Sequence, residues 1–290
     1  KRALQLGTVS PTSRDAWIRE AKDSALRALL ADNIDSDQAI NVWRDVDEEF
    51  FLRESAEDVA EFTKAILASP APKKAVILIK DVGVEIPVAT QIFVHCKDRD
   101  NNFAIIAAAL DRLNLNIQDA RLHTTSDGSA FDVFYVLDEE DQPIGKDAFR
   151  CEKILKSLDQ AISNPTEICM DRSQRTPRQL KNFALKTSAS LRQDVETNSS
   201  ILQIITPDRP GLLAHLTQIF VRFELRVLNA KISTLGERVE DIFYLTDNHF
   251  EPLNDDELNA ALTNTIATEL DQRNEEEGQE YKLRKMKKWN

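Results

Sequence analysis

The sequence is poor in the residues from which several common kinds of site are built. It has seven glycines and three cysteines in 290 residues. So few glycines argue against a glycine-rich dinucleotide or phosphate loop, and no serine nucleophile elbow or kinase signature occurs. The cysteines Cys96, Cys151 and Cys169 are odd in number and far apart. They argue against a disulfide scaffold and favour a reducing cytoplasm.

Histidine is also scarce, and no metal-ligand spacing such as His-x-x-x-His occurs. The four histidines are far apart: His95, His123, His215 and His249. We interpret them as structural side chains and expect no metal site. Acidic clusters such as residues 139–141 are interpreted as solvated faces. The sequence therefore predicts no catalytic residues in this chain.

Other absences bear on partners. No run approaches the roughly 20 consecutive apolar residues of a membrane span. The formal net charge of -12 argues against a general nucleic-acid binder, because a phosphate backbone requires a basic surface. The chain begins at Lys1, without an initiator Met or an apolar signal run, and we interpret it as a piece of a longer protein.

The pattern over residues 1–72 predicts a small helical subdomain. Apolar residues recur at helical spacing from residue 11 to 30 and again around Ile40 and Trp43. Ser55 followed by Asp58 predicts a capping box that starts a further helix. The proline-rich stretch at 70–72 is expected to end that helix.

The rest of the chain contains one unit twice. Strand patterns, an intervening helical stripe and a closing helix occur in the order βαββα, and the same order then returns. Asp98, Leu115 and Ala120 recur 110 residues later as Asp208, Leu225 and Ala230. A second set, Asp132, Phe134, Tyr135 and Asp138, recurs after a one-residue slip as Asp241, Phe243, Tyr244 and Asp247. We predict duplicated domains at 73–170 and 171–274, followed by a charged tail at 275–290.

This order predicts an α+β fold: two ferredoxin-like βαββα sandwiches, each an antiparallel sheet with helices on one face. The alternating run at 185–191 predicts an additional edge strand. A polar stretch that contains Pro165 and Pro177 is expected to link the two copies.

The first strand-to-helix turn of the second unit has the composition of a small anion site. Pro210 suits the first turn of a helix, and Gly211 leaves the helix N-terminus open. Asp208 and Arg209 add one charge of each sign, so a zwitterionic amino acid is the ligand that fits. The alternative is that Asp208 only caps the helix, Arg209 is a surface charge, and Pro-Gly is turn punctuation.

These motifs resemble a known family. Residues 204–214, Ile-Ile-Thr-Pro-Asp-Arg-Pro-Gly-Leu-Leu-Ala, resemble the signature turn of ACT domains. Residues 50–58, 119–121, 176–180 and 227–232 resemble segments of the bacterial bifunctional PII uridylyltransferase/uridylyl-removing enzymes. The likeness covers nearly the whole chain, in order.

The resemblance implies a longer enzyme with nucleotidyltransferase and HD phosphohydrolase domains upstream, which would require Mg²⁺. It also implies that the ACT pair senses glutamine, and that the PII protein is a partner of the full-length enzyme. No cofactor is expected in this chain. The implied ligand-binding residues are Asp208, Arg209, Gly211, Leu212, Leu213 and Asn229 in the second unit, and Asp98, Arg99, Asn102 and Phe103 in the first.

Two alternatives stay open. Residues 100–102, Asp-Asn-Asn, depart from the family's Arg-Pro type of turn, which puts ligand binding by the first unit in doubt. The whole chain could also be an ACT-type oligomerisation or interaction module that binds no metabolite. A small independent enzyme is the weakest alternative, because no base and nucleophile are paired in the sequence.

Overall fold

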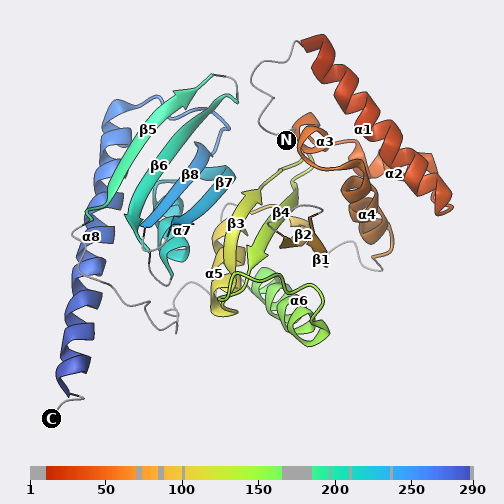
Figure 1. Ribbon diagram of the computed structural model, residues 1–290. Coiled ribbons are helices and arrows are strands. Elements are labelled where there is room, and N and C mark those ends of the chain that lie inside the picture. The colour runs from red at the N-terminus through yellow and green to blue at the C-terminus, as the bar shows by residue number, and fades with distance from the viewer. Residues whose placement is uncertain are drawn as a thin grey trace.

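The computed structural model describes residues 11–69, 74–83, 88–99, 102–164, 185–195, 197–208, 211–235 and 238–287. The described chain begins with a cluster of helices (Figure 1): α1 (Pro11–Ala31), α2 (Ser36–Trp43), α3 (Glu48–Arg53) and α4 (Ala56–Leu67). Ser55 caps α4 as predicted, because its Oγ accepts the Asp58 N–H at 3.0 Å and donates to the Asp58 carboxylate at 2.9 Å.

Both predicted repeats form, and each carries an additional edge strand. In the first repeat the elements are β1 (Val76–Val82), β2 (Ala89–Lys97), α5 (Asn102–Arg112), β3 (Asn116–Arg121), β4 (Ser129–Leu137) and α6 (Ala148–Ser163). In the second they are β5 (Ser188–Asp194), β6 (Ser199–Pro207), α7 (Leu212–Arg222), β7 (Arg226–Leu235), β8 (Arg238–Thr246) and α8 (Asp256–Lys287). The α+β prediction is confirmed.

The two half-sheets join into one antiparallel sheet, which the sequence did not predict. The described strands lie in the order β1-β2-β4-β3-β7-β8-β6-β5. At the joint, Ala120 of β3 lies opposite Ala230 of β7, and these residues are themselves equivalent in the repeat. A pseudo-twofold axis therefore passes between the two alanines. The register irregularities at 117–119 and 227–229 also occupy equivalent positions.

Helices α5, α6, α7 and α8 cover one face of the sheet and share a continuous apolar core with it. The other face differs between the repeats. In the first repeat, Phe93, Phe131 and Val133 are buried against the N-terminal helices, and Phe62 of α4 stacks on Phe93 with ring centroids 4.0 Å apart. The aromatic side chains of this outer face thus fasten the helical cluster to the first half-sheet.

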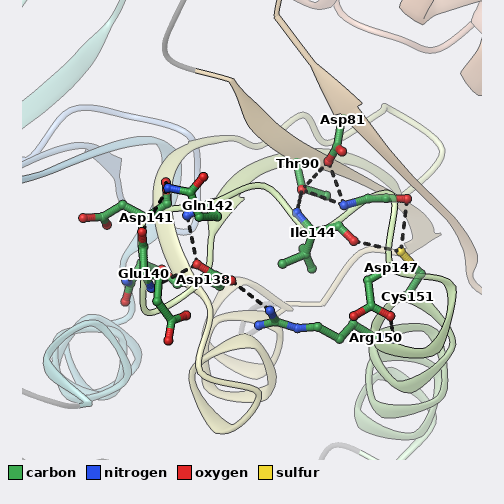
Figure 2. A network of polar contacts seen from close by, with 12 residues as sticks. Asp81, Thr90, Asp138, Glu140, Asp141, Gln142, Ile144, Asp147, Arg150 and Cys151 are labelled. Carbon is green, nitrogen blue, oxygen red and sulfur yellow. Dashed lines mark hydrogen bonds and ion pairs between the residues drawn. The ribbon is translucent and has the colours of Figure 1, made fainter.

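A polar network pins the loop that follows β4, as Figure 2 shows. Thr90 Oγ1 accepts the Ile144 N–H at 2.7 Å, and Asp81 Oδ1 accepts the Gly145 N–H at 2.7 Å. Asp138 accepts the Gln142 N–H at 2.9 Å within the same loop. The loop therefore closes over the start of β2.

The second repeat builds the same loop from equivalent positions. Asp247 accepts the Glu251 N–H at 2.9 Å, and Ser200 Oγ accepts the Leu253 N–H at 2.9 Å. Even the residue with positive φ recurs, Asp141 in one loop and Phe250 in the other. The repeat is thus a repeat of local hydrogen bonding as well as of apolar pattern.

Candidate functional site

The predicted ligand residues lie mainly at two equivalent corners of the sheet. In each repeat the corner is the turn from the first core strand to the following helix, β2 to α5 or β6 to α7. Helices α5 and α7 lie side by side across the pseudo-twofold axis. The two corners therefore belong to one continuous assembly, and their side chains can be compared position by position.

The corner of the second repeat keeps an open helix N-terminus. Gly211 is the N-cap residue of α7, with φ of 72°, and has no side chain with which to make a capping hydrogen bond. Its carbonyl accepts the His215 N–H at 3.0 Å, as a regular first turn requires. The first backbone N–H groups of a helix have no partner within the helix, and the helix dipole makes this end attractive to anions. The N-cap residue of α7 is therefore Gly211 and not Asp208.

The two leucines among the predicted ligand residues of this corner differ in how deeply they are buried. Leu212 is buried in the shared core, and Leu213 is partly buried against it. Their side chains anchor the first turn of α7, while their backbone N–H groups belong to the helix N-terminus. Asp208 directly follows β6 and is partly exposed. Arg209 and Pro210 lie outside the described residues.

A buried carboxyl group lies beside this corner and was not among the predicted site residues. Asp241 of β8 is 1% exposed, and its Oδ1 has no hydrogen-bond partner. Burial raises the pKa of Asp241 to about 8; a backbone hydrogen bond from Ser233 opposes the rise, and the charge of Asp208 adds to it. Asp241 is therefore mostly protonated at neutral pH. Its signal in the sequence was the recurrence of an acidic residue, Asp132 and Asp241, within an apolar strand.

The corner of the first repeat is closed by its own side chains. The Asp98 carboxylate accepts a hydrogen bond from Thr124 at 3.1 Å and forms an ion pair with Arg226, which comes from β7 of the other repeat. Arg99 Nη1 donates to the Ile162 carbonyl at 3.0 Å, near the end of α6. Both charged side chains of this corner are thus used in structural contacts.

The remaining predicted residues of the first repeat are also used internally. Asn102 Nδ2 donates to the Lys97 carbonyl at 3.1 Å. Phe103 is buried and stacks on Phe134, with ring centroids 6.3 Å apart. Cys96 lies beneath this turn, and burial, reinforced by Asp132 and Asp98, raises the pKa of its thiol to about 12. It is therefore not a reactive thiolate.

Asn229, the last predicted residue, lies at the joint between the repeats. It is buried, its Oδ1 has no hydrogen-bond partner, and its Cα partner across the joint is Arg121. The Arg121 guanidinium donates to the Glu54 carboxylate and to the Arg53 carbonyl, both at 3.0 Å. The joint is therefore connected directly to the N-terminal helices.

This connection is buried and polar. The Glu54 side chain is fully buried, and Tyr135 donates to it at 3.3 Å. Burial raises the pKa of Glu54 more than neighbouring Arg121 lowers it, while the same carboxylate keeps Arg121 charged by raising its pKa. A change at the β3–β7 joint can thus be transmitted to the helical cluster through the Arg121–Glu54 ion pair.

The histidines occupy structural positions. His95 Nδ1 lies 3.1 Å from the Ala130 carbonyl, and His215 Nε2 lies 3.2 Å from the Glu269 carboxylate. Burial, with Arg53 and Arg121 nearby, lowers the pKa of His123 to about 3, so this ring is neutral. Among the described residues, no group of three or more His, Cys, Asp and Glu side chains is placed to hold a metal ion. Within the same ranges, no helix has the combination of length and apolar character needed for a membrane span.

Comparison with known proteins agrees with this architecture. A family model described as "Uridylyltransferase GlnD fifth domain" matches residues 13–65, which cover most of the helical cluster. The chain is 42% identical over 278 residues to the bifunctional uridylyltransferase/uridylyl-removing enzyme of Stutzerimonas stutzeri, covering 96% of this chain and 31% of that protein. The chain is similar to the C-terminal part of this enzyme. The predicted resemblance is confirmed.

Other relatives of the same name give the same result. The enzyme of Pseudomonas fluorescens is 41% identical over 271 residues, covering 93% of this chain and 30% of that protein. The enzyme of Pseudomonas aeruginosa is 41% identical over 275 residues, covering 94% and 31%. The chain thus spans about a third of the length of these relatives.

Proposed function

We propose that this chain is the regulatory region of a cytoplasmic enzyme that uridylylates the PII protein and removes the uridylyl group again, and that it senses glutamine. The relatives' names support the two activities. The catalytic domains would lie outside this chain, and Mg²⁺ is proposed for them alone. The unpaired thiols of Cys96 and Cys151 fit a reducing compartment.

The observation that carries the sensing role is the difference between the two corners. The corner of the second repeat has Gly211 as the N-cap of α7, which leaves room for a carboxylate at the helix N-terminus, and the buried carboxyl group of Asp241 lies beside it. The corner of the first repeat has its Asp98 and Arg99 already engaged. Glutamine therefore binds once per chain, in the second repeat.

The signal leaves the site through the joint between the repeats. Asn229 lies on β7 opposite Arg121, and Arg121 holds the buried Glu54 of the helical cluster. A ligand shifts such an equilibrium only by binding one arrangement more tightly than the other. Glutamine binding favours one arrangement of β7 relative to the N-terminal helices. Catalytic domains upstream would respond to this arrangement.

Isothermal titration of glutamine into the chain tests this function. Asp208→Asn removes a charge-assisted contact, which corresponds to about a 10- to 100-fold loss of affinity. The matched variant Asp98→Asn changes an equivalent residue whose carboxylate is engaged by Thr124 and Arg226, and leaves glutamine affinity within about twofold. Absence of heat at millimolar glutamine with an intact circular dichroism spectrum would sink the proposal, as would equal losses in the two variants.

A second function, an interaction module, is favoured by the ends of the sheet. Strands β1 and β5 are its two edges, and exposed edges are templates for pairing with another chain. The side chains of β5 alternate between exposed and partly exposed positions from Ser188 to Arg192. Sedimentation velocity with and without glutamine separates the two functions: a ligand-independent dimer supports the module, and a ligand-dependent change supports the sensor.

A further inference from the structure

The outer face of the second half-sheet, which lies opposite α7 and α8, is not part of the apolar core beneath the N-terminal helices. That core contains residues of β1, β2 and β4, but none of β5 to β8. In Figure 1 the N-terminal helices accordingly lie next to β1 to β4 and away from β5 and β6. The outer face of the second half-sheet presents four apolar residues that belong to neither core cluster: Ile201, Ile205, Ile242 and Tyr244.

The strand register arranges the side chains of this face in rows. One row runs from the free edge of the sheet to the joint and consists of Arg192, Ile201, Tyr244 and Asn229. The next row consists of Ser190, Gln203, Ile242 and Lys231. Beyond the joint, the two rows continue on β3 in Arg121 and Asp119. An arginine therefore lies at the free edge of the face, and Asn229 and Asp119 lie near its inner end.

Two acceptor atoms at this inner end lack a donor. The Oδ1 atoms of Asp119 and Asn229 are buried and have no hydrogen-bond partner, and the two residues occupy equivalent positions in the two repeats. In the described part of the chain, Lys231 lies opposite Asp119 but is exposed and forms no ion pair with it. Buried acceptors without a donor cost stability. Their presence points to a donor from outside the chain.

Arg192, at the free edge, is the complementary group. It is exposed, and it makes no ion pair or side-chain hydrogen bond with the other described residues. Its guanidinium group presents five N–H donors in a planar fork. Strands β5 and β7 are three strand spacings apart, which is about 14 Å. The chain therefore cannot pair its own Arg192 with its own acceptors, but a second copy of the chain can.

We propose that the outer faces of two second half-sheets pack on each other about a twofold axis parallel to the strands, and that Arg192 of each copy donates to Asn229 and Asp119 of the other. Such an axis places β5 of one copy over β7 of the other and keeps the rows aligned. Arg192 then faces Asn229, and Tyr244 faces Ile201. Each contact occurs twice, as a twofold interface requires.

The layers of the molecule favour a sheet as the occupant. Packed sheets lie about 10 Å apart. Over the first half-sheet the corresponding layer is taken by the helical cluster, in which α4 contacts β1. The twofold axis directs β5 of the second copy toward this cluster and directs the first half-sheet of the second copy away from it. The second copy therefore fits beside the helical cluster, in the same layer.

The size of the face sets the expected strength of the pairing. Three outward residues on each of four strands correspond to an interface on the order of 1,000 Å² in total, the low end for specific interfaces. We therefore expect a reversible dimer with a Kd on the order of 10 µM. This pairing uses the face of the sheet, not its edges, and it does not depend on the glutamine site.

Sedimentation equilibrium of the 290-residue chain without glutamine, from about 1 to 500 µM, tests the inference. Ile242→Glu places a charge at the centre of the face and should raise the Kd by about 100-fold or more. Arg192→Glu removes the guanidinium group and should raise it by about 10- to 100-fold. The control Lys153→Glu changes an exposed residue of α6 by the same charge and should leave the Kd within about twofold.

A chain that stays monomeric over this range overturns the inference. A dimer that Ile242→Glu leaves intact also overturns it, because pairing at the sheet edges does not involve β8. Equal losses in Arg192→Glu and Lys153→Glu overturn the role of Arg192. Should Ile242→Glu fold poorly by circular dichroism, Arg192→Glu, at an exposed position, still decides the matter. Glutamine binding is decided separately, by the titrations of the proposed function.

Discussion

The two repeats have the same strands, helices, loops and bulges, yet the side-chain contacts at their strand-to-helix corners differ. In the first, Asp98 is held by Thr124 and by Arg226 of the other repeat. In the second, α7 starts at Gly211, which has no side chain to cap the helix, and the carboxyl group of Asp241 is buried nearby. A duplicated domain thus provides two equivalent corners, and the corner of the first repeat is bound to the second repeat through Asp98 and Arg226.

The outer faces of the two half-sheets also differ, in how far their side chains are buried. Phe93 and Phe131 of the first repeat are buried under the helical cluster, whereas the equivalent Gln203 and Glu240 of the second are partly exposed and hydrogen-bonded to each other at 2.7 Å. The first repeat is fastened to the upstream helices, and the second keeps a polar face. This difference explains how a signal from the second repeat would be delivered through the first.

The largest change in stability that tests this comparison is expected on the outer face of the sheet. Phe93→Ala removes a stacked ring from a closed core and should destabilise the chain by about 3 to 5 kcal/mol. Gln203→Ala, at the equivalent position, should cost less than about 1 kcal/mol. Urea unfolding followed by circular dichroism measures both. Similar costs would show that the two faces are covered alike.

The next effect concerns the joint. Arg121→Ala leaves the carboxylate of Glu54 buried without its cation, and we expect a loss of about 2 to 4 kcal/mol, moderated by protonation of Glu54. Lys231→Ala changes the equivalent, exposed residue of the second repeat and should stay within about 0.5 kcal/mol. Thermal unfolding of the two variants side by side is the measurement. An equal, small loss would mean that the Arg121–Glu54 pair does not fasten the helices.

A smaller effect, on the pH dependence of stability, should occur in both repeats. The pKa of Asp241 rises from 3.8 to about 8 on folding, so between these values the folded state holds a proton that the unfolded state has lost. Stability therefore falls as the pH rises from about 4 to 8. Asp241→Asn should flatten this slope and recover on the order of 1 to 3 kcal/mol at pH 8.

Asp132→Asn should flatten the slope in the same way, because burial raises that pKa too. Urea unfolding at pH 5, 6.5 and 8 gives the slopes. A variant whose stability falls with pH as steeply as the original would contradict the buried, protonated state of its aspartate.

The smallest effect concerns the turn itself. Gly211 has a φ of 72°, a conformation that residues with a side chain adopt at a cost. Gly211→Ala should destabilise the chain by about 1 kcal/mol and weaken glutamine binding. Phe103→Leu, in the first turn of α5, should affect stability but leave glutamine affinity unchanged. Calorimetry would contradict the account if Phe103→Leu weakened binding and Gly211→Ala did not.

Much of the fold could be predicted from the sequence because its signals are local. The capping box at Ser55, the helical stripes and the 110-residue offset all act over short distances or by direct repetition. The β3–β7 joint could not be predicted, since edge pairing between domains leaves no mark in a single strand. The same holds for the aromatic contacts of Phe62 and Phe93, which join distant segments.

The candidate site was predictable only in outline. The turn with Asp208 and Gly211 was recognisable from its residue types, whereas the capture of Asp98 by Arg226 depends on how the two repeats meet. The aspartates of β4 and β8 were visible as a repeated pair, but whether they face core or solvent depends on strand register. Their burial therefore had to come from the structure.

The most direct measurement is the backbone amide spectrum of the isotope-labelled chain during a titration with glutamine. The account predicts that the amide signals of Gly211, Leu212 and Leu213 shift and saturate at one glutamine per chain, while those of Asn102 and Phe103 stay in place. Equal shifts at both corners, saturation at two glutamines per chain, or unmoved signals at Gly211 would contradict it.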